Sequence, residues 1–110
     1  MAEPTTAREL IENMPGALVA KAAEGLDEII QFNMTEPEPG RYWLHIVDGA
    51  CTFHEGEAPA PTLTIIAPAD VWLDVSLGRT NGQMAFMMGK FKAEGDLTLL
   101  MKLGKLFKRK

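Results

Sequence analysis

Apolar and polar residues alternate along several short stretches of the chain, and this period of two predicts β-strands. Residues 26–34 place their larger apolar side chains, Phe32 among them, on one face and polar side chains on the other. Residues 62–67 and 90–94 alternate in the same way, the latter with Phe91 between two lysines. Each of these segments has the pattern of a strand with one buried face.

A two-residue turn at Asp48-Gly49 predicts a β-hairpin and sets its register. This dipeptide favours a type I′ turn, which requires positive φ at both positions. The turn places Leu44 opposite Phe53 on the face that we expect to be buried. His45 and His54 then lie together on the other face.

Capping residues, prolines and glycines mark the ends of the predicted helices. Thr6 and Glu9 form a capping box, in which each side chain bonds to a backbone amide near the other residue. Asp96 caps a C-terminal helix. The helices begin after Thr6, at Ala17, at Pro68, after Thr80 or Asn81, and at Leu97, and the first four end at Pro15, Ala23, Gly78 and Gly89.

The predicted element order α-α-β-β-β-β-α-α-β-α specifies an α/β (α+β) fold with one sheet and helices over one face. We place a single domain at residues 1–110, because this length suits one domain. No apolar run reaches the roughly 18–20 residues of a membrane span, and the N-terminal residues lack a secretory pattern. Cys51 is the only cysteine, which suits a reducing compartment. We therefore expect a cytoplasmic domain.

Charge is divided unevenly along the chain. Residues 1–74 carry 13 acidic and 3 basic side chains, whereas residues 75–110 carry 2 acidic and 8 basic ones. Cations gather at the C-terminal end as Lys105, Lys108, Arg109 and Lys110. They suit either a solvated helix end that complements the helix dipole or a contact with an anionic membrane. We expect no nucleic-acid partner, because the acidic remainder would repel it.

Few side chains offer catalytic chemistry. His45 and His54 could share a metal ion, but a zinc site needs three or four protein ligands and no further His or Cys completes it. Ser76 is the only serine and lacks a Gly-x-Ser-x-Gly motif. Cys51 faces the predicted core, where a thiol is inert. The sequence predicts neither an enzyme nor a cofactor.

Apolar residues dominate the short helix before Gly89, which contains Met84, Phe86, Met87 and Met88. A helix that is apolar all round must be enclosed all round. Its side chains therefore belong either to an ordinary core or to the wall of a cavity, where the flexible methionine side chain adapts to ligands of different shape. Composition alone leaves both alternatives open.

The segment from residue 85 to residue 107, AFMMGKFKAEGDLTLLMKLGKLF, resembles the signature of the sterol carrier protein 2 (SCP-2) domain family. The shared features are an Ala-Phe helix end, a Gly-Lys pair, an alternating strand, a Gly-Asp turn and an apolar C-terminal helix. The earlier strands, hairpin and helix also follow the order of the family. The resemblance extends over residues 5–108.

This resemblance implies a five-stranded sheet with helices packed over one face and an apolar tunnel between the sheet and the C-terminal helices. Such domains bind fatty acids, fatty acyl-CoA, sterols, phospholipids or quinones, without known catalysis by the domain itself. Met88 replaces a glutamine of some members, and the peroxisomal tripeptide of some eukaryotic members is absent. The positions that match the apolar lining are Phe32, Leu44, Trp72, Phe86, Met88, Phe91, Leu100, Met101 and Phe107.

Two functions follow from the resemblance. The first is non-catalytic binding and transfer of an apolar lipid, with transient contact of Lys105 and Lys108–Lys110 with anionic membranes. The alternative is an accessory protein that presents quinone or another isoprenoid lipid to a biosynthetic enzyme. An apolar tunnel distinguishes length and bulk better than chemical identity, so the sequence leaves the lipid open.

Overall fold

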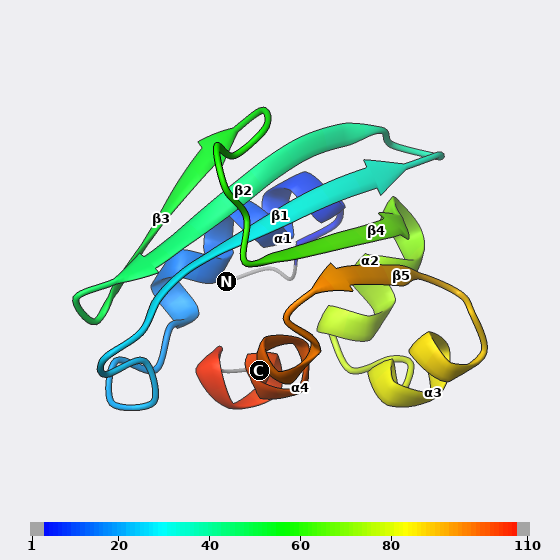
Figure 1. Cartoon of the computed structure of the whole chain (residues 1–110). Helices are drawn as coiled ribbons and strands as arrows, with labels where there is room; N and C mark the ends of the chain where they lie inside the picture. The colour runs from blue at the N-terminus through cyan, green and yellow to red at the C-terminus, as the bar shows by residue number, and fades with distance from the viewer. Residues whose placement is uncertain (1–3, 108–110) are drawn as a thin grey trace.

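The computed structural model describes residues 4–107 of the chain. These residues form a five-stranded sheet with helices over one face, the arrangement that the sequence predicts (Figure 1). The sheet has the order β3-β2-β1-β4-β5, in which β1 and β4 are parallel and the other neighbours antiparallel. The strands are β1 (Asp27–Thr35), β2 (Gly40–Val47), β3 (Ala50–Glu55), β4 (Leu63–Pro68) and β5 (Lys92–Gly95).

The helical layer covers one face of this sheet. Figure 1 shows α1 behind β1 and β2, with α2, α3 and α4 gathered below β4 and β5. Within residues 4–107, no helix combines the length and apolar character that crossing a bilayer requires. The helices are α1 (Ala7–Asn13), the 3₁₀ helix η1 (Met14–Ala17), α2 (Ala69–Ser76), α3 (Gly82–Met87) and α4 (Leu97–Leu106).

The core lies between the sheet and the helices, and the predicted alternation identifies the strand residues that fill it. Phe32 of β1, Leu44 of β2 and Ile65 of β4 are fully buried. The hairpin register is confirmed, since Leu44 pairs with Phe53 across β2 and β3. Both residues of the Asp48-Gly49 turn have positive φ, as a type I′ turn requires.

The open face of the sheet carries the crossover from β3 to β4. Figure 1 shows this loop passing in front of β2 and β1. Gln31 of β1 fixes the loop, because its amide oxygen accepts a hydrogen bond from Ala58 N (2.7 Å) and its amide nitrogen donates to Gly56 O (3.0 Å). Gln31 is the buried polar residue of this face, and its hydrogen bonds remove the cost of burying an amide.

Two predicted helix starts are confirmed by their capping bonds. The Thr6 hydroxyl accepts from Glu9 N at 3.1 Å, and the Glu9 carboxylate accepts from Thr5 N at 2.8 Å, one residue earlier than a standard capping box. Asp96 accepts from Thr98 N and Leu99 N at the start of α4. Each cap satisfies backbone donors that have no partner inside the helix.

The helix predicted for Ala17–Ala23 is wrong. The chain there forms η1 and then turns, and Leu18 is extended in an isolated bridge to Phe107. Val19 N donates to Leu106 O at 2.7 Å, which fixes the same contact. This pairing with the C-terminal segment outweighs the high helix propensity of the alanines, a common outcome when tertiary contacts compete with propensity.

The enclosure predicted for the methionine-rich helix is also wrong. α3 buries Ala85, but Met84, Met87 and Met88 are 55%, 77% and 66% exposed. A helix of barely two turns at the edge of the layer presents one side to the protein, and these three methionines lie off that side. These methionines therefore form an exposed apolar surface instead of a core.

Candidate functional site

A large cavity lies among the helices, with a volume of about 1200 Å³. Its main walls are three helical faces, each with residues at the i, i+3, i+4 spacing that lines one side of a helix. No residue of β1 to β4 is among its lining, so the cavity differs in place from the tunnel expected between the sheet and the C-terminal helices. The walls consist of Leu10, Asn13, Met14 and Ala17 from the α1–η1 segment, Trp72, Val75 and Ser76 from α2, and Leu100, Leu103, Gly104 and Phe107 from α4 and its C-cap.

Small residues make room for this volume. Gly16, Gly78, Gly82 and Gly104 all belong to the lining. A Cβ atom added at Gly104 would meet no atom within 4 Å, so this position faces open space although it lies inside α4. A larger residue there would enter space that is now empty.

The lining contains no ionisable side chain within residues 4–107. Its polar members are neutral, and Asn13, Ser76, Thr80, Asn81 and Gln83 make up that group. A mostly apolar wall with a few neutral polar groups is typical of a small-molecule site. Such a wall offers hydrogen bonds to a ligand but no charge to pair with one.

Aromatic rings connect the cavity wall to the core. The Trp72 ring lies 5.6 Å from Phe32 and 5.8 Å from Phe91, measured between ring centroids, and Phe91 lies 5.4 Å from Phe86. Trp72 is 4% exposed, and its Nε1 has no hydrogen-bond partner among the described residues. Buried polar atoms are normally paired, so this donor stands out within the site.

Six of the nine residues that the resemblance assigned to the lining belong to this cavity. They are Trp72, Phe86, Phe91, Leu100, Met101 and Phe107. The other three do not line it. Phe32 and Leu44 are fully buried in the core, because they occupy central strands of the sheet, and Met88 is exposed beyond the end of α3. Phe32 still contacts the wall from behind, through Trp72.

The wall contributed by the α1–η1 segment was missed, although its spacing was visible in the sequence. Leu10, Asn13, Met14 and Ala17 follow the same i, i+3, i+4, i+7 pattern as Leu100, Leu103, Gly104 and Phe107. Gly104 was a further signal in the sequence. A glycine on the apolar face of a helix leaves space where a larger side chain would otherwise pack.

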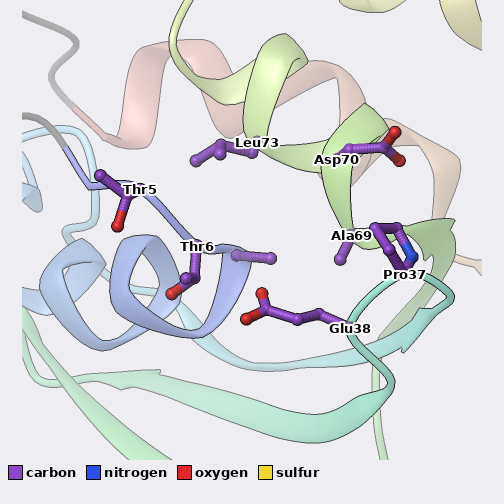
Figure 2. Close-up of a pocket in the computed structure, with 8 residues that line it drawn as sticks. Thr5, Thr6, Pro37, Glu38, Ala69, Asp70 and Leu73 are labelled. Atoms are coloured by element: carbon purple, nitrogen blue, oxygen red, sulfur yellow. The ribbon is translucent and has the colours of Figure 1, made fainter.

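A second, smaller cavity of about 200 Å³ lies where α1 and α2 begin. Figure 2 shows the Glu38 carboxylate directed toward Thr6, whereas the Asp70 carboxylate points away from the cavity. Pro37 and Glu38 of the β1–β2 turn form its outer edge. The negative charge of Glu38 therefore lies near the N-terminal, positive end of the α1 dipole.

The candidate catalytic residues do not gather at either cavity. His45 Nε2 lies 2.8 Å from Asp27 Oδ1, and His54 stacks on Trp43 with ring centroids 4.0 Å apart, both on the open face of the sheet. Ser76 lines the large cavity, on the other side of the sheet from both histidines. Residues 4–107 contain no cluster of three or more His, Cys, Asp or Glu side chains suited to a metal ion.

Burial explains the state of the single thiol. Cys51 lies in β3 opposite Ile46 and is half-buried. This environment raises the pKa of the thiol to about 11, because burial disfavours the thiolate. The residue therefore lacks the lowered pKa of a nucleophilic cysteine.

Comparison with known proteins assigns the fold to a family. The model of the SCP-2 sterol transfer family matches residues 8–108. The chain belongs to this family. A relative from Xenopus tropicalis, hydroxysteroid dehydrogenase-like protein 2, is 30% identical over 98 residues, which is 87% of this chain but 22% of that protein. The chain thus spans less than a quarter of the length of this relative.

Solved SCP-2 structures have the same fold. Palmitated SCP2L2 from Aedes aegypti superposes with a TM-score of 0.71 at 20% identity, covering 90% of this chain and 88% of that one. The sec-alkylsulfatase Pisa1 from Pseudomonas sp. contains a similar region, with a TM-score of 0.81 at 17% identity over 93% of this chain and 16% of the enzyme. The ubiquinone synthesis protein UbiJ-SCP2 matches at 0.60 and 14% identity, covering 82% and 76% of the two chains.

Proposed function

We propose that this SCP-2 chain binds one apolar lipid in the large cavity and transfers it without catalysing a reaction. The cavity itself carries the proposal, because about 1200 Å³ of concave space with a mostly apolar wall is typical of a site for an apolar small molecule. An apolar ligand would restore dispersion contacts to the walls. The palmitated SCP2L2 structure supports a lipid of this kind. The candidates are a fatty acid, a fatty acyl-CoA, a sterol or a phospholipid.

The absence of catalysis is part of the same proposal. Ser76 and Thr80 are the hydroxyl side chains in the cavity lining. Within residues 4–107, the lining contains no His, Lys, Asp or Glu that could act as a base for either of them. A serine nucleophile needs an adjacent base within hydrogen-bonding reach. Replacing Ser76 with Ala should therefore remove no hydrolytic activity.

An accessory role is the alternative, in which the chain presents quinone or another isoprenoid lipid to a biosynthetic enzyme. The similar fold of a ubiquinone synthesis protein supports it. Native mass spectrometry of the freshly purified protein distinguishes the two functions by the mass of the bound lipid. Acyl lipids favour transfer, and an isoprenoid favours presentation.

Contact with membranes would allow the lipid to enter and leave. Met84 and Met87 of α3 and Met101 of α4 are more than half exposed, and Lys105 lies in the last turn of α4. The other proposed cations, Lys108 to Lys110, lie outside the described residues. Each cation near an anionic surface contributes on the order of 1 kcal/mol, so vesicle binding should weaken as salt rises. A cytoplasmic location remains a prediction.

A substitution at Gly104 tests the binding site directly. Gly104→Phe should fill the cavity, because the added side chain meets open space, and should prevent displacement of a fluorescent fatty acid by unlabelled lipid. Gly104→Ala is the matched control and should keep binding, while raising stability by up to about 1 kcal/mol. Unchanged lipid binding in a folded Gly104→Phe protein would place the lipid elsewhere.

A further inference from the structure

We propose that the cavity selects neutral lipids that carry an acceptor oxygen, and that the indole N–H of Trp72 donates the hydrogen bond that recognises this oxygen. The inference rests on the proposed lipid-binding function and narrows its ligand class. Ketones, esters and alcohols with a long apolar body meet the requirement. A lipid that must bury a carboxylate in the cavity does not.

The first observation is the charge of the wall. Within residues 4–107, no Lys, Arg, His, Asp or Glu lines the cavity. Burying an ionised carboxylate without a cation is strongly unfavourable. Neutral hydrogen-bonding groups, by contrast, are present at Asn13, Ser76 and Gln83. The wall is therefore matched to a polar ligand without net charge.

The second observation is the unpaired donor. Trp72 is 4% exposed and lines the cavity, yet its Nε1 has no partner among the described residues. Indole nitrogen is a donor only, and leaving a buried donor unpaired costs free energy that a ligand oxygen would recover. Trp72→Phe would lose this bond and keep most of the aromatic surface.

Neighbouring side chains hold the indole in place. Phe32 and Phe91 pack against it at 5.6 and 5.8 Å between ring centroids. Ser76 follows Trp72 by four residues on α2, which places its hydroxyl on the same side of the helix. Nε1 is covered in this structure, so the proposed bond requires a turn of the ring or a shift of a neighbour that uncovers it.

A matched series of C14 ligands tests the recognition. Tetradecane offers no acceptor, 2-tetradecanone offers a neutral one, and tetradecanoate is charged at pH 7.5. Trp72→Phe should weaken binding of the ketone by roughly three- to tenfold, the equivalent of one neutral hydrogen bond. The same substitution should change the affinity for tetradecane by less than about twofold, since that ligand makes no such bond. Wild-type protein should bind the ketone more tightly than tetradecanoate.

Trp43→Phe is the control variant, because Trp43 stacks on His54 on the open face of the sheet. It should leave all three affinities unchanged. It also assigns the indole signals in a ¹H–¹⁵N NMR spectrum, since the chain has two tryptophans. In folded wild-type protein the ketone should move the Trp72 indole N–H signal downfield and slow its hydrogen exchange, and tetradecane should not. This measurement holds even if Trp72→Phe folds poorly.

The outcomes separate this inference from the proposed function. If none of the three ligands and no co-purified lipid binds, the proposed function fails together with the inference. If lipids bind but the ketone neither shifts the indole N–H nor loses affinity in Trp72→Phe, only the recognition by Trp72 is overturned. Tetradecanoate binding at least as tight as ketone binding would overturn the neutral class, whether or not it survives deletion of residues 108–110.

Discussion

In the centre of the sheet Phe32 and Leu44 are fully buried, whereas on α3 and α4 Met87 and Met101 are 77% and 65% exposed. The two regions contain equally apolar residues but use them differently. The strands alternate and have a partner on both sides, so their apolar face closes into a core. The C-terminal helices border a cavity, and these two methionines stay exposed, Met101 at the cavity wall and Met87 beyond it. Apolar composition alone therefore does not distinguish a core from an exposed apolar surface; its period and its neighbours do.

Charge is also divided along the sequence. The chain before residue 75 has an excess of ten acidic side chains, and the part after it an excess of six basic ones. The exposed methionines lie within the basic part. A surface that is both apolar and cationic suits an anionic lipid layer.

The largest effect should come from deleting the same side chain in each region. Leu44→Ala removes a fully buried leucine from β2 and should lower the free energy of unfolding by about 3–5 kcal/mol. Leu100→Ala removes a half-buried leucine beside existing empty space and should cost about 1 kcal/mol. Urea denaturation of both variants measures the difference.

Lipid binding should show the opposite order. Leu44 does not line the cavity and Leu100 does, so only Leu100→Ala should change lipid affinity by more than a few fold. If the two variants lose equal stability and equal affinity, the division into a packed sheet and a hollow helical layer is wrong.

The next effect concerns the hydrogen bonds of Gln31, the buried polar side chain of the sheet. Gln31→Leu leaves the Ala58 N–H and the Gly56 carbonyl without their partner and should cost about 1–3 kcal/mol. The β3–β4 loop should then be cleaved faster by protease, because Gln31 fixes it. Asn33→Ala is the control. The Asn33 side chain accepts a hydrogen bond from Gln31 Nε2, but it is not one of the two bonds by which Gln31 holds the loop. Unaltered proteolysis in Gln31→Leu would show that other contacts fix the loop.

Local rules in the sequence were enough for the hairpin register and for two helix starts. The Asp48-Gly49 turn determines the pairing of Leu44 with Phe53, because a two-residue turn leaves one register. The capping residues Thr6 and Asp96 act on backbone amides within four residues. These features depend on neighbours in sequence, so a single sequence reveals them.

Long-range contacts were not visible in the same way. The segment after Ala17 has the composition of a helix, yet Leu18 pairs with Phe107 from the far end of the chain. Phe32 and Leu44 match family positions by sequence, but their place in central strands puts them behind the cavity wall. Which apolar face meets empty space depends on how the helices pack, and no local pattern specifies that.

The exposed methionines should matter for transfer and not for stability. Replacing Met84, Met87 and Met88 with Gln should change the free energy of unfolding by less than about 0.5 kcal/mol per site, the usual range for surface substitutions. Lipid transfer between vesicles should slow, because the apolar surface near the cavity is lost. Met34→Gln is the matched comparison in β1, where the side chain is 4% exposed and the same change should cost several kcal/mol. Unchanged transfer by the triple variant would contradict a role of α3 at membranes.

The two regions should also differ in thiol chemistry. Burial raises the pKa of Cys51 in β3 to about 11, whereas a thiol placed by Met87→Cys in a Cys51→Ser background should keep an ordinary pKa near 8.5, because that site is 77% exposed. At pH 8 the α3 thiol should therefore react with iodoacetamide about a hundredfold faster, since the thiolate is the nucleophile.

The raised pKa of Cys51 also determines how the stability of the protein changes with pH. Between about pH 8.5 and pH 11 the unfolded chain loses this proton before the folded chain does, so stability should fall with rising pH, and below pH 8.5 Cys51 should have no such effect. Equal alkylation rates, or a Cys51→Ser variant whose stability falls just as steeply above pH 8.5, would show that β3 does not enclose the thiol.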